Sequence, residues 1–208
     1  AASGLISIRL GALGPSFATV SACASAADAI GMAADMIRLG RAKVMIAGGS
    51  EAAIIPICVA GFEQAHALCS DSNDAPERAS RPFDETRSGF VLSEGGGILV
   101  LEEESFARER GAPILATLAG YGAASDGYHI TAPDPEGRGA TRAMQIAMDR
   151  GQIEREEVGY INAHGTSTPR NDQMESAVIR KLFYTNGRRV PVSSTKSMTG
   201  HLGGAAGA

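Results

Sequence analysis

The sequence of 208 residues contains no tryptophan, and aromatic residues make up only 5% of it. No segment reaches about 18 uninterrupted apolar residues, the length that a membrane-spanning helix requires. Basic runs are also missing, and the formal net charge is −4, which disfavours binding to nucleic acid or to an anionic membrane surface. We therefore expect a soluble protein that binds neither nucleic acid nor a membrane.

Cysteine is scarce as well, because the chain has only three cysteines and no CxxC or Cys/His spacing of a metal site. An odd number without such spacing argues against a disulfide framework and against a zinc site. We expect no bound metal, and a reducing compartment such as the cytoplasm.

Apolar residues are plentiful, at 44% of the chain, and 26 glycines suit tight turns and close backbone packing. Short continuous apolar runs, which are typical of strands buried on both faces, alternate with patterns at helical spacing. This alternation predicts an α/β fold. The expected strands are 42–49, 95–101, 158–163 and 190–194, and the expected helices are 23–40, 102–110, 139–150 and 173–183.

Cys23 stands between an apolar run, 17–22, and the alanine-rich helical pattern that follows it. This order places the thiol at the first turn of a helix, where unpaired backbone N–H groups and the helix dipole favour the thiolate. The same N–H groups could stabilise an oxyanion. The alternative interpretation is a small buried thiol packed beside alanines, which is the commoner role of a lone cysteine.

Three further reactive side chains, His164, Lys196 and His201, each follow a predicted strand or the turn after it. Reactive groups gather at the carboxyl ends of strands in open α/β sheets, so four such residues, Cys23 included, suggest one site. Each also has a structural alternative, because buried histidines and lysines usually have partners. A thiolate with two histidines and a lysine indicates acyl transfer through a thioester and stabilisation of an enolate. Papain-like hydrolysis is the competing chemistry.

Two hydroxyl side chains follow His164 closely. Thr166 and Thr168 alternate around Ser167, so both hydroxyls could face one side of the chain and bind an amide-containing substrate. The alternative is an ordinary turn stabilised by its own hydroxyl groups.

Six motifs, which together span most of the chain, resemble the β-ketoacyl synthase family, and specifically its elongating, fatty-acid-type condensing enzymes. The two most specific are the last two in the chain. The motifs are VSACASA at 20–26, AGGSEA at 47–52, ASRPFDETRSGFVLSEGGG at 79–97, SDGYHIT at 125–131, NAHGTSTP at 162–169 and SSTKSMTGHLGGAAGA at 193–208.

The resemblance implies a thiolase-like, five-layered αβαβα fold that this chain contains in part, truncated at both ends. Residues 1–111 would be the later part of the N-terminal half, and residues 112–208 the earlier part of the C-terminal half. The family's early segment and its late GFGGTN-like loop are not in this sequence. We therefore expect that the 208 residues, expressed alone, do not catalyse condensation.

The resemblance also assigns roles to the candidate residues. Cys23 would take the acyl chain from acyl-ACP, where ACP is acyl carrier protein. His164 and His201 would stabilise the enolate formed when malonyl-ACP loses CO₂, and Lys196 would maintain the electrostatics of the site. Three threonines would contact the phosphopantetheine arm, which the carrier delivers, so that no cofactor is bound by the enzyme itself: Thr131, Thr166 and Thr168.

The family further implies fatty acid biosynthesis in a cytoplasm of bacterial type, or in an organelle of such origin. It implies a homodimer, in which 17–22 would pair with its copy across a two-fold axis. The alternatives are a ketosynthase subunit of a type II polyketide synthase, a non-catalytic chain-length partner subunit, and a degradative thiolase. The presence of Cys23 argues against the non-catalytic subunit, and the lack of a second cysteine near the C-terminus argues against the thiolase.

The chain departs from the family pattern at a few positions in the first half. Ser88 and Ser93 stand where an aspartate and a glycine are common. His66, Asp71 and Ser72 stand where many members carry arginines, near the face on which the acidic carrier docks. We therefore expect a carrier-docking surface that differs from the family's in this region.

Overall fold

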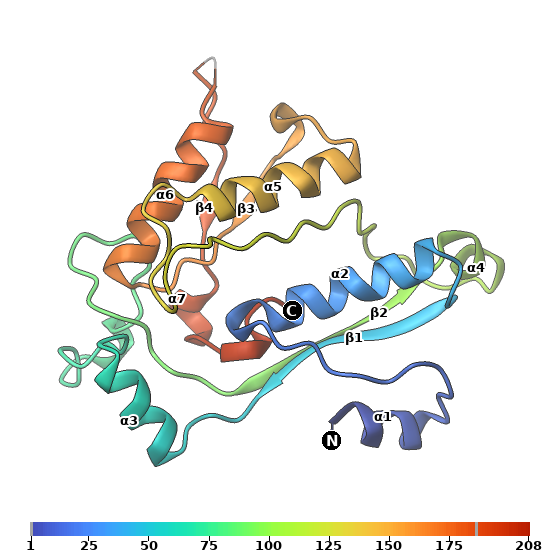
Figure 1. The fold of residues 1–208 in the computed structure, drawn as a ribbon, viewed down its shortest axis with the longest axis horizontal. Helices are drawn as coiled ribbons and strands as arrows, with labels where there is room; N and C mark the ends of the chain where they lie inside the picture. The colour runs from blue at the N-terminus through green and yellow to red at the C-terminus, as the bar shows by residue number, and fades with distance from the viewer. Residues whose placement is uncertain (1, 186) are drawn as a thin grey trace. The chain divides into compact units, whose positions relative to one another are not determined.

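The computed structural model describes residues 2–185 and 187–208 (Figure 1). The chain forms two compact units that are interleaved along the sequence. The first contains the residues up to Glu51, Gly95–Thr117 and Gly203–Ala208, and the second contains Ala52–Glu94 and Leu118–Leu202. These units are made of separate stretches of the chain, whereas the predicted halves, 1–111 and 112–208, are each continuous. The division into halves therefore stays a prediction.

The first unit is built on a two-stranded antiparallel sheet. Strand β1 (Val44–Glu51) pairs with β2 (Gly95–Glu102) in a register that runs from Val44 opposite Glu102 to Glu51 opposite Gly95. Helix α2 (Ser25–Arg38) packs against β1 (Figure 1). The remaining elements of this unit are α1 (Ala2–Leu10), the 3₁₀ turn η1 (Ala22–Ala24), α4 (Glu104–Glu109) and the 3₁₀ turn η4 (Gly203–Ala205).

Small residues let α2, β1 and η4 approach one another closely. The core of the unit joins Ile30 and Ala33 of α2 to Ala47 of β1. A Cβ atom at Gly49 would lie 2.7 Å from the Gly204 carbonyl oxygen and 2.8 Å from the Ala26 Cβ. Only glycine therefore fits here, which explains one of the paired glycines at the end of the β1 motif.

The predicted burial of 42–49 and 95–101 on both faces is wrong for the described residues. Ala47 is the only buried residue of β1, and β2 has none. Ile98, Leu99 and Val100 are 51%, 46% and 62% exposed. The physical reason is that the sheet has two strands here and α2 packs on it, whereas burial on both faces requires a layer on each side.

The second unit contains two of the four expected helices. Helices α5 (Arg138–Gly151) and α6 (Pro169–Phe183) confirm two sequence predictions and pack on each other (Figure 1). Strands β3 (Ile161–Asn162) and β4 (Val192–Ser193) pair in parallel and are shorter than predicted. The other elements are α3 (Pro56–Gln64), η2 (Pro76–Arg78), η3 (Arg155–Glu157) and α7 (Lys196–Thr199).

The core of the second unit lies under the inner face of α6. Val178, Ile179, Leu182 and Phe183 are all buried there, with Ala163 after β3 and Val190 before β4. Their three- and four-residue spacing is the reason that this stretch forms a helix with one buried face. Ile161 of β3 and Val192 of β4 pack against this core, so the two strands are held by the same cluster as the helix.

No helix among the described residues is both long and apolar enough to cross a membrane. The apolar run 17–22, which was expected to act as a pairing strand, has no regular strand structure in the single chain before the turn at Ala22.

Candidate active site

Cys23 lies on the 3₁₀ turn η1, directly before α2 begins at Ser25. The predicted position at the start of a helix is therefore confirmed. Hydrogen bonds around Ser25 hold the turn, because its hydroxyl donates to the Ala22 carbonyl at 2.7 Å and accepts the Ser21 N–H at 2.9 Å. Ala22 has a φ of +50°, in the left-handed region that costs a non-glycine residue free energy. The thiol thus follows a strained residue that the surrounding turn holds in place.

His164 follows β3, and its backbone is held by a buried carboxylate. The N–H groups of His164 and Gly165 donate to the two oxygens of Glu175, each at 2.7 Å. Asn171 donates to the same carboxylate at 3.2 Å. Glu175 is only 5% exposed, so this contact fixes the segment that carries the His164 ring.

Lys196 holds His164 from the other side. Its ammonium Nζ donates to the His164 carbonyl oxygen at 2.7 Å, and the residue is 5% exposed. The hydroxyl of Ser80 donates to the Lys196 carbonyl, which anchors the start of α7. A buried ammonium requires such a partner, and here the partner is the backbone of the candidate catalytic histidine.

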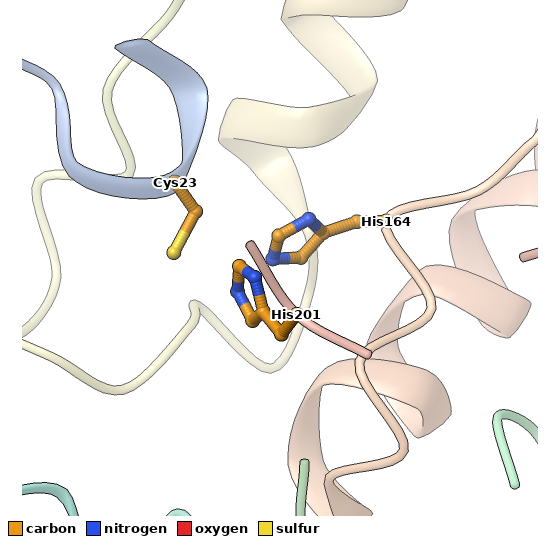
Figure 2. A group of neighbouring side chains, drawn as sticks. All are labelled: Cys23, His164 and His201. Carbon is orange, nitrogen blue, oxygen red and sulfur yellow. The ribbon is translucent and has the colours of Figure 1, made fainter. Parts of the chain in front are cut away.

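His201 is held by backbone hydrogen bonds to the segment 91–93. Its N–H donates to the Val91 carbonyl at 2.7 Å, and its carbonyl accepts the Ser93 N–H at 3.0 Å. The imidazole is buried between two rings, with the Phe90 centroid at 5.0 Å and the His164 centroid at 5.5 Å. The two imidazoles stand edge to face, with 88° between their planes (Figure 2).

The His164 imidazole is held in its neutral form. Desolvation, the Lys196 ammonium and His201, in that order, lower the pKa of His164 to about 3. The His164 residue has exposed surface area. Nearby protein atoms nevertheless displace enough water for desolvation to be the largest cause of its lowered pKa. Lys196 and His201 act in the same direction, so the lowered pKa does not depend on desolvation alone. A neutral ring can donate a hydrogen bond to a developing oxyanion without giving up its proton.

The pKa of Glu175 is shifted upward, unlike that of His164. Burial raises the pKa of this carboxyl, and the backbone N–H groups of Gly165 and His164 offset part of the increase. The same two N–H groups are the contacts that position His164. The carboxyl therefore serves as an acceptor for the backbone.

The structure brings Thr166 and Thr168 together, with 2.8 Å between their hydroxyl oxygens. Ser167 between them has a φ of +68° and is fully buried. Thr131 lies on a separate loop, where its N–H donates to Nδ1 of His129 at 3.1 Å. Within the described parts of each unit taken singly, no three histidine, cysteine or acidic side chains converge as a metal site would require.

Sequence reasoning missed the two acids of α6 that support this site. Asp172 and Glu175 are 1% and 5% exposed, and both accept backbone N–H groups from neighbouring segments. Acidic residues in the first turns of a helix usually face solvent and complement its dipole. The signal that could have identified them is their spacing, because they continue the buried stripe of Val178, Ile179 and Leu182 toward the N-terminus of the helix.

Comparison with known proteins gave two matching family models. The model described as beta-ketoacyl synthase, N-terminal domain, matches residues 1–107, and the model of the C-terminal domain of the same family matches residues 115–208. A 3-oxoacyl-[acyl-carrier-protein] synthase 2 from Synechocystis sp. is 54% identical over 99% of this chain and 49% of its own length. The Staphylococcus aureus protein of that name is 52% identical, over 99% and 51%. The chain thus spans about half the length of the curated relatives it matches.

Solved structures resemble this chain as well. A type II polyketide ketosynthase, in complex with its acyl-carrier protein and bound to a hexaketide, has a TM-score of 0.95 and 40% identity, over 99% of this chain and 50% of its own. A beta-ketoacyl synthase from Burkholderia phymatum has a TM-score of 0.85 and 44% identity, over 91% and 45%. These scores confirm the predicted thiolase-like ketosynthase fold.

The lowered pKa of His164 predicts an NMR titration in which this imidazole stays neutral as the pH falls from 8 to 5, unlike a free imidazole, which titrates near 6.5. Between about pH 6.5 and 3 the unfolded chain binds this proton and the folded chain does not, so the residue's contribution to stability decreases as the pH falls through that window. A His164 midpoint near 6.5 would contradict the environment described above.

Proposed function

Because the chain belongs to the β-ketoacyl synthase family, we propose that it carries the condensing site of a 3-oxoacyl-ACP synthase that elongates fatty acids. The reaction is a decarboxylative Claisen condensation between an acyl group on Cys23 and malonyl-ACP. The observation that carries the proposal is the pair of imidazoles, His164 and His201, held edge to face, with a neutral His164 fixed by Lys196 and Glu175.

The first half-reaction uses the thiolate of Cys23. It attacks the carbonyl carbon of acyl-ACP, the new C–S bond forms, and the phosphopantetheine thiolate of the carrier leaves. The helix start at Cys23 supports this step, since backbone N–H groups there stabilise both a thiolate and the oxyanion of the tetrahedral intermediate.

The second half-reaction uses the two histidines. Malonyl-ACP loses CO₂, and the electron pair of the broken C–C bond passes to the thioester as an enolate, which the N–H groups of His164 and His201 stabilise. The enolate carbon then attacks the acyl carbonyl on Cys23, and the thiolate of Cys23 leaves as β-ketoacyl-ACP forms. Lys196 supports the step through its hydrogen bond to the His164 carbonyl, and its positive charge adds to desolvation in lowering the pKa of His164.

The substrates reach the site on a carrier. The names of the curated relatives refer to acyl-carrier protein, and one structural neighbour is a ketosynthase in complex with such a carrier. Thr166 and Thr168 form a hydroxyl pair that can bind the amides of a phosphopantetheine arm, and Thr131 would add a third contact. The enzyme would then need no cofactor of its own, and it would act in the cytoplasm.

A second candidate function is the ketosynthase of a type II polyketide synthase. The observation that favours it is the TM-score of 0.95 with such a ketosynthase, at 40% identity. The identities of 54% and 52% to 3-oxoacyl-ACP synthases favour the fatty acid enzyme. Cys23 argues against a non-catalytic chain-length partner, although a ketosynthase in complex with a chain-length factor is among the structural neighbours.

The thiol assignment predicts that iodoacetamide, near pH 7, labels Cys23 of the intact enzyme well before Cys58 and Cys69. The start of a helix activates Cys23, whereas the thiol of Cys69 already donates to the Asp71 carboxylate at 3.3 Å. Peptide mass spectrometry after a time course measures the order. Equal labelling of all three cysteines in the folded enzyme would refute the assignment.

The histidine assignment predicts that the two half-reactions separate. Replacing His164 or His201 by Ala should slow malonyl-ACP decarboxylation by about 10²–10³, the scale of one lost oxyanion donor, and leave acyl transfer to Cys23 measurable. Released CO₂ and the mass of the acyl-enzyme report the two steps. Lys181→Ala, at an exposed position near the end of α6, is the control. Normal decarboxylation by His201→Ala would show that our role for His201 is wrong.

We also propose a homodimer that uses the segment around 17–22. The side chains of Leu13 and Val20 are 98% and 92% exposed in the single chain, and a second copy would cover them. Sedimentation of the intact enzyme should show a dimer, and Val20→Asp should weaken it because a charge would enter the apolar contact. A stable, active monomer would contradict this proposal.

A further inference from the structure

The segment Arg81–Arg87, which we call the bracing segment, contacts Ser167, which separates the two threonines of the hydroxyl pair, and the backbone that follows it. The N–H of Arg81 donates to the hydroxyl oxygen of Ser167 at 3.1 Å. The guanidinium of Arg87 donates from Nε to the Thr168 carbonyl at 3.2 Å and from Nη2 to the Pro169 carbonyl at 2.7 Å. The bracing segment therefore holds the turn between the two threonines and the chain directly after it.

Ser167 is the strained residue of this arrangement. Its φ of +68° is in the left-handed region, and it is fully buried. A serine in that conformation costs free energy and persists only where its surroundings hold it. The N–H of Arg81 on its hydroxyl is such a restraint, and it keeps Thr166 and Thr168 on either side of one fixed turn.

Arg87 is itself held in one orientation. Its Nη1 donates to the Asp84 carbonyl at 2.9 Å, and its Nε lies 3.5 Å from a carboxylate oxygen of Asp172. The same Asp172 oxygen accepts the Phe83 N–H at 2.8 Å. The planar guanidinium reaches three carbonyls and a carboxylate at once, which the single ammonium group of lysine cannot reproduce.

From these contacts we infer that the bracing segment holds the Thr166–Thr168 hydroxyl pair in the geometry that binds the pantetheine arm of the substrate. Ser167 and Arg87 are then positioning residues that act through the two threonines. This inference rests on the proposed function, in which the arm delivers the substrate to Cys23. It adds that recognition of the arm depends on residues that do not touch it.

The test compares two electrophiles that react with Cys23 of the intact enzyme. Iodoacetamide carries no arm, whereas a bromoacetyl group attached to the thiol of pantetheine reaches Cys23 along the path of the substrate.

The variants are Ser167→Gly and Arg87→Lys. Glycine adopts a positive φ without strain, so the first variant removes the hydroxyl but suits the turn. Arg87→Lys keeps the positive charge beside Asp172 but loses the planar guanidinium, which donates to several acceptors at once. Arg170→Lys, at an exposed arginine beside Pro169, is the matched control.

In both variants we expect the pantetheine reagent to alkylate Cys23 roughly five- to tenfold more slowly, the scale of one lost hydrogen bond. Iodoacetamide should react as it does in the unmodified enzyme, and Arg170→Lys should change neither rate. Thermal melting of each variant monitors folding, and either variant alone can carry the test.

Unchanged pantetheine rates in both variants would overturn the inference, and so would an equal loss of rate with both reagents. Failure of the proposed function gives a different result. In that case the unmodified enzyme would show no preference of the pantetheine reagent for Cys23 over Cys58 and Cys69.

Discussion

The pair of backbone hydrogen bonds from His164 and Gly165 to Glu175 is the constraint on which the rest of the site depends. The carboxylate lies on the buried face of α6, so the histidine takes its position from the core of its unit. Lys196 then contacts the carbonyl of the same residue, and the charge of that lysine contributes to the neutral state of the ring. Position and protonation state thus depend on one cluster of polar contacts, which is costly to disturb because its two charged members, Glu175 and Lys196, are buried and have little access to water.

Much of this could be predicted from the sequence. The apolar spacing of α2, α5 and α6 identified the helices, and the order of strand ends placed Cys23, His164, Lys196 and His201 among the reactive residues. Burial of the strands could not be predicted in the same way, since a run such as 95–101 has equal hydrophobicity whether one face is covered or two. The roles of Asp172 and Glu175 could not be predicted either. The sequence of the first turn does not show whether an acid lies on the buried face or on the solvent face of the helix.

Backbone strain collects where function is proposed. Within residues 2–185 and 187–208, three of the five non-glycine residues with positive φ are Ala22, Phe83 and Ser167. The first precedes the candidate nucleophile, the second belongs to the bracing segment, and the third separates the two threonines. Such conformations cost free energy, so each requires hydrogen bonds around it. The contacts of Ser25, Asp172 and Arg81 supply these bonds, and a sequence pattern alone contains no record of them.

The departure at Ser88 has a consequence for how this chain can change over evolutionary time. The Ser88 hydroxyl donates to the Asp71 carboxylate at 2.8 Å, and Arg81 lies 3.8 Å from the same oxygen. The family resemblance implies an aspartate at the position of Ser88 in many members, whereas the acid of this contact is Asp71 here. Restoring aspartate at 88 alone would set two carboxylates against each other, and removing Asp71 alone would leave Arg81 without its acid. We therefore expect substitutions at 71 and 88 to be coupled, so that their effects on stability do not add.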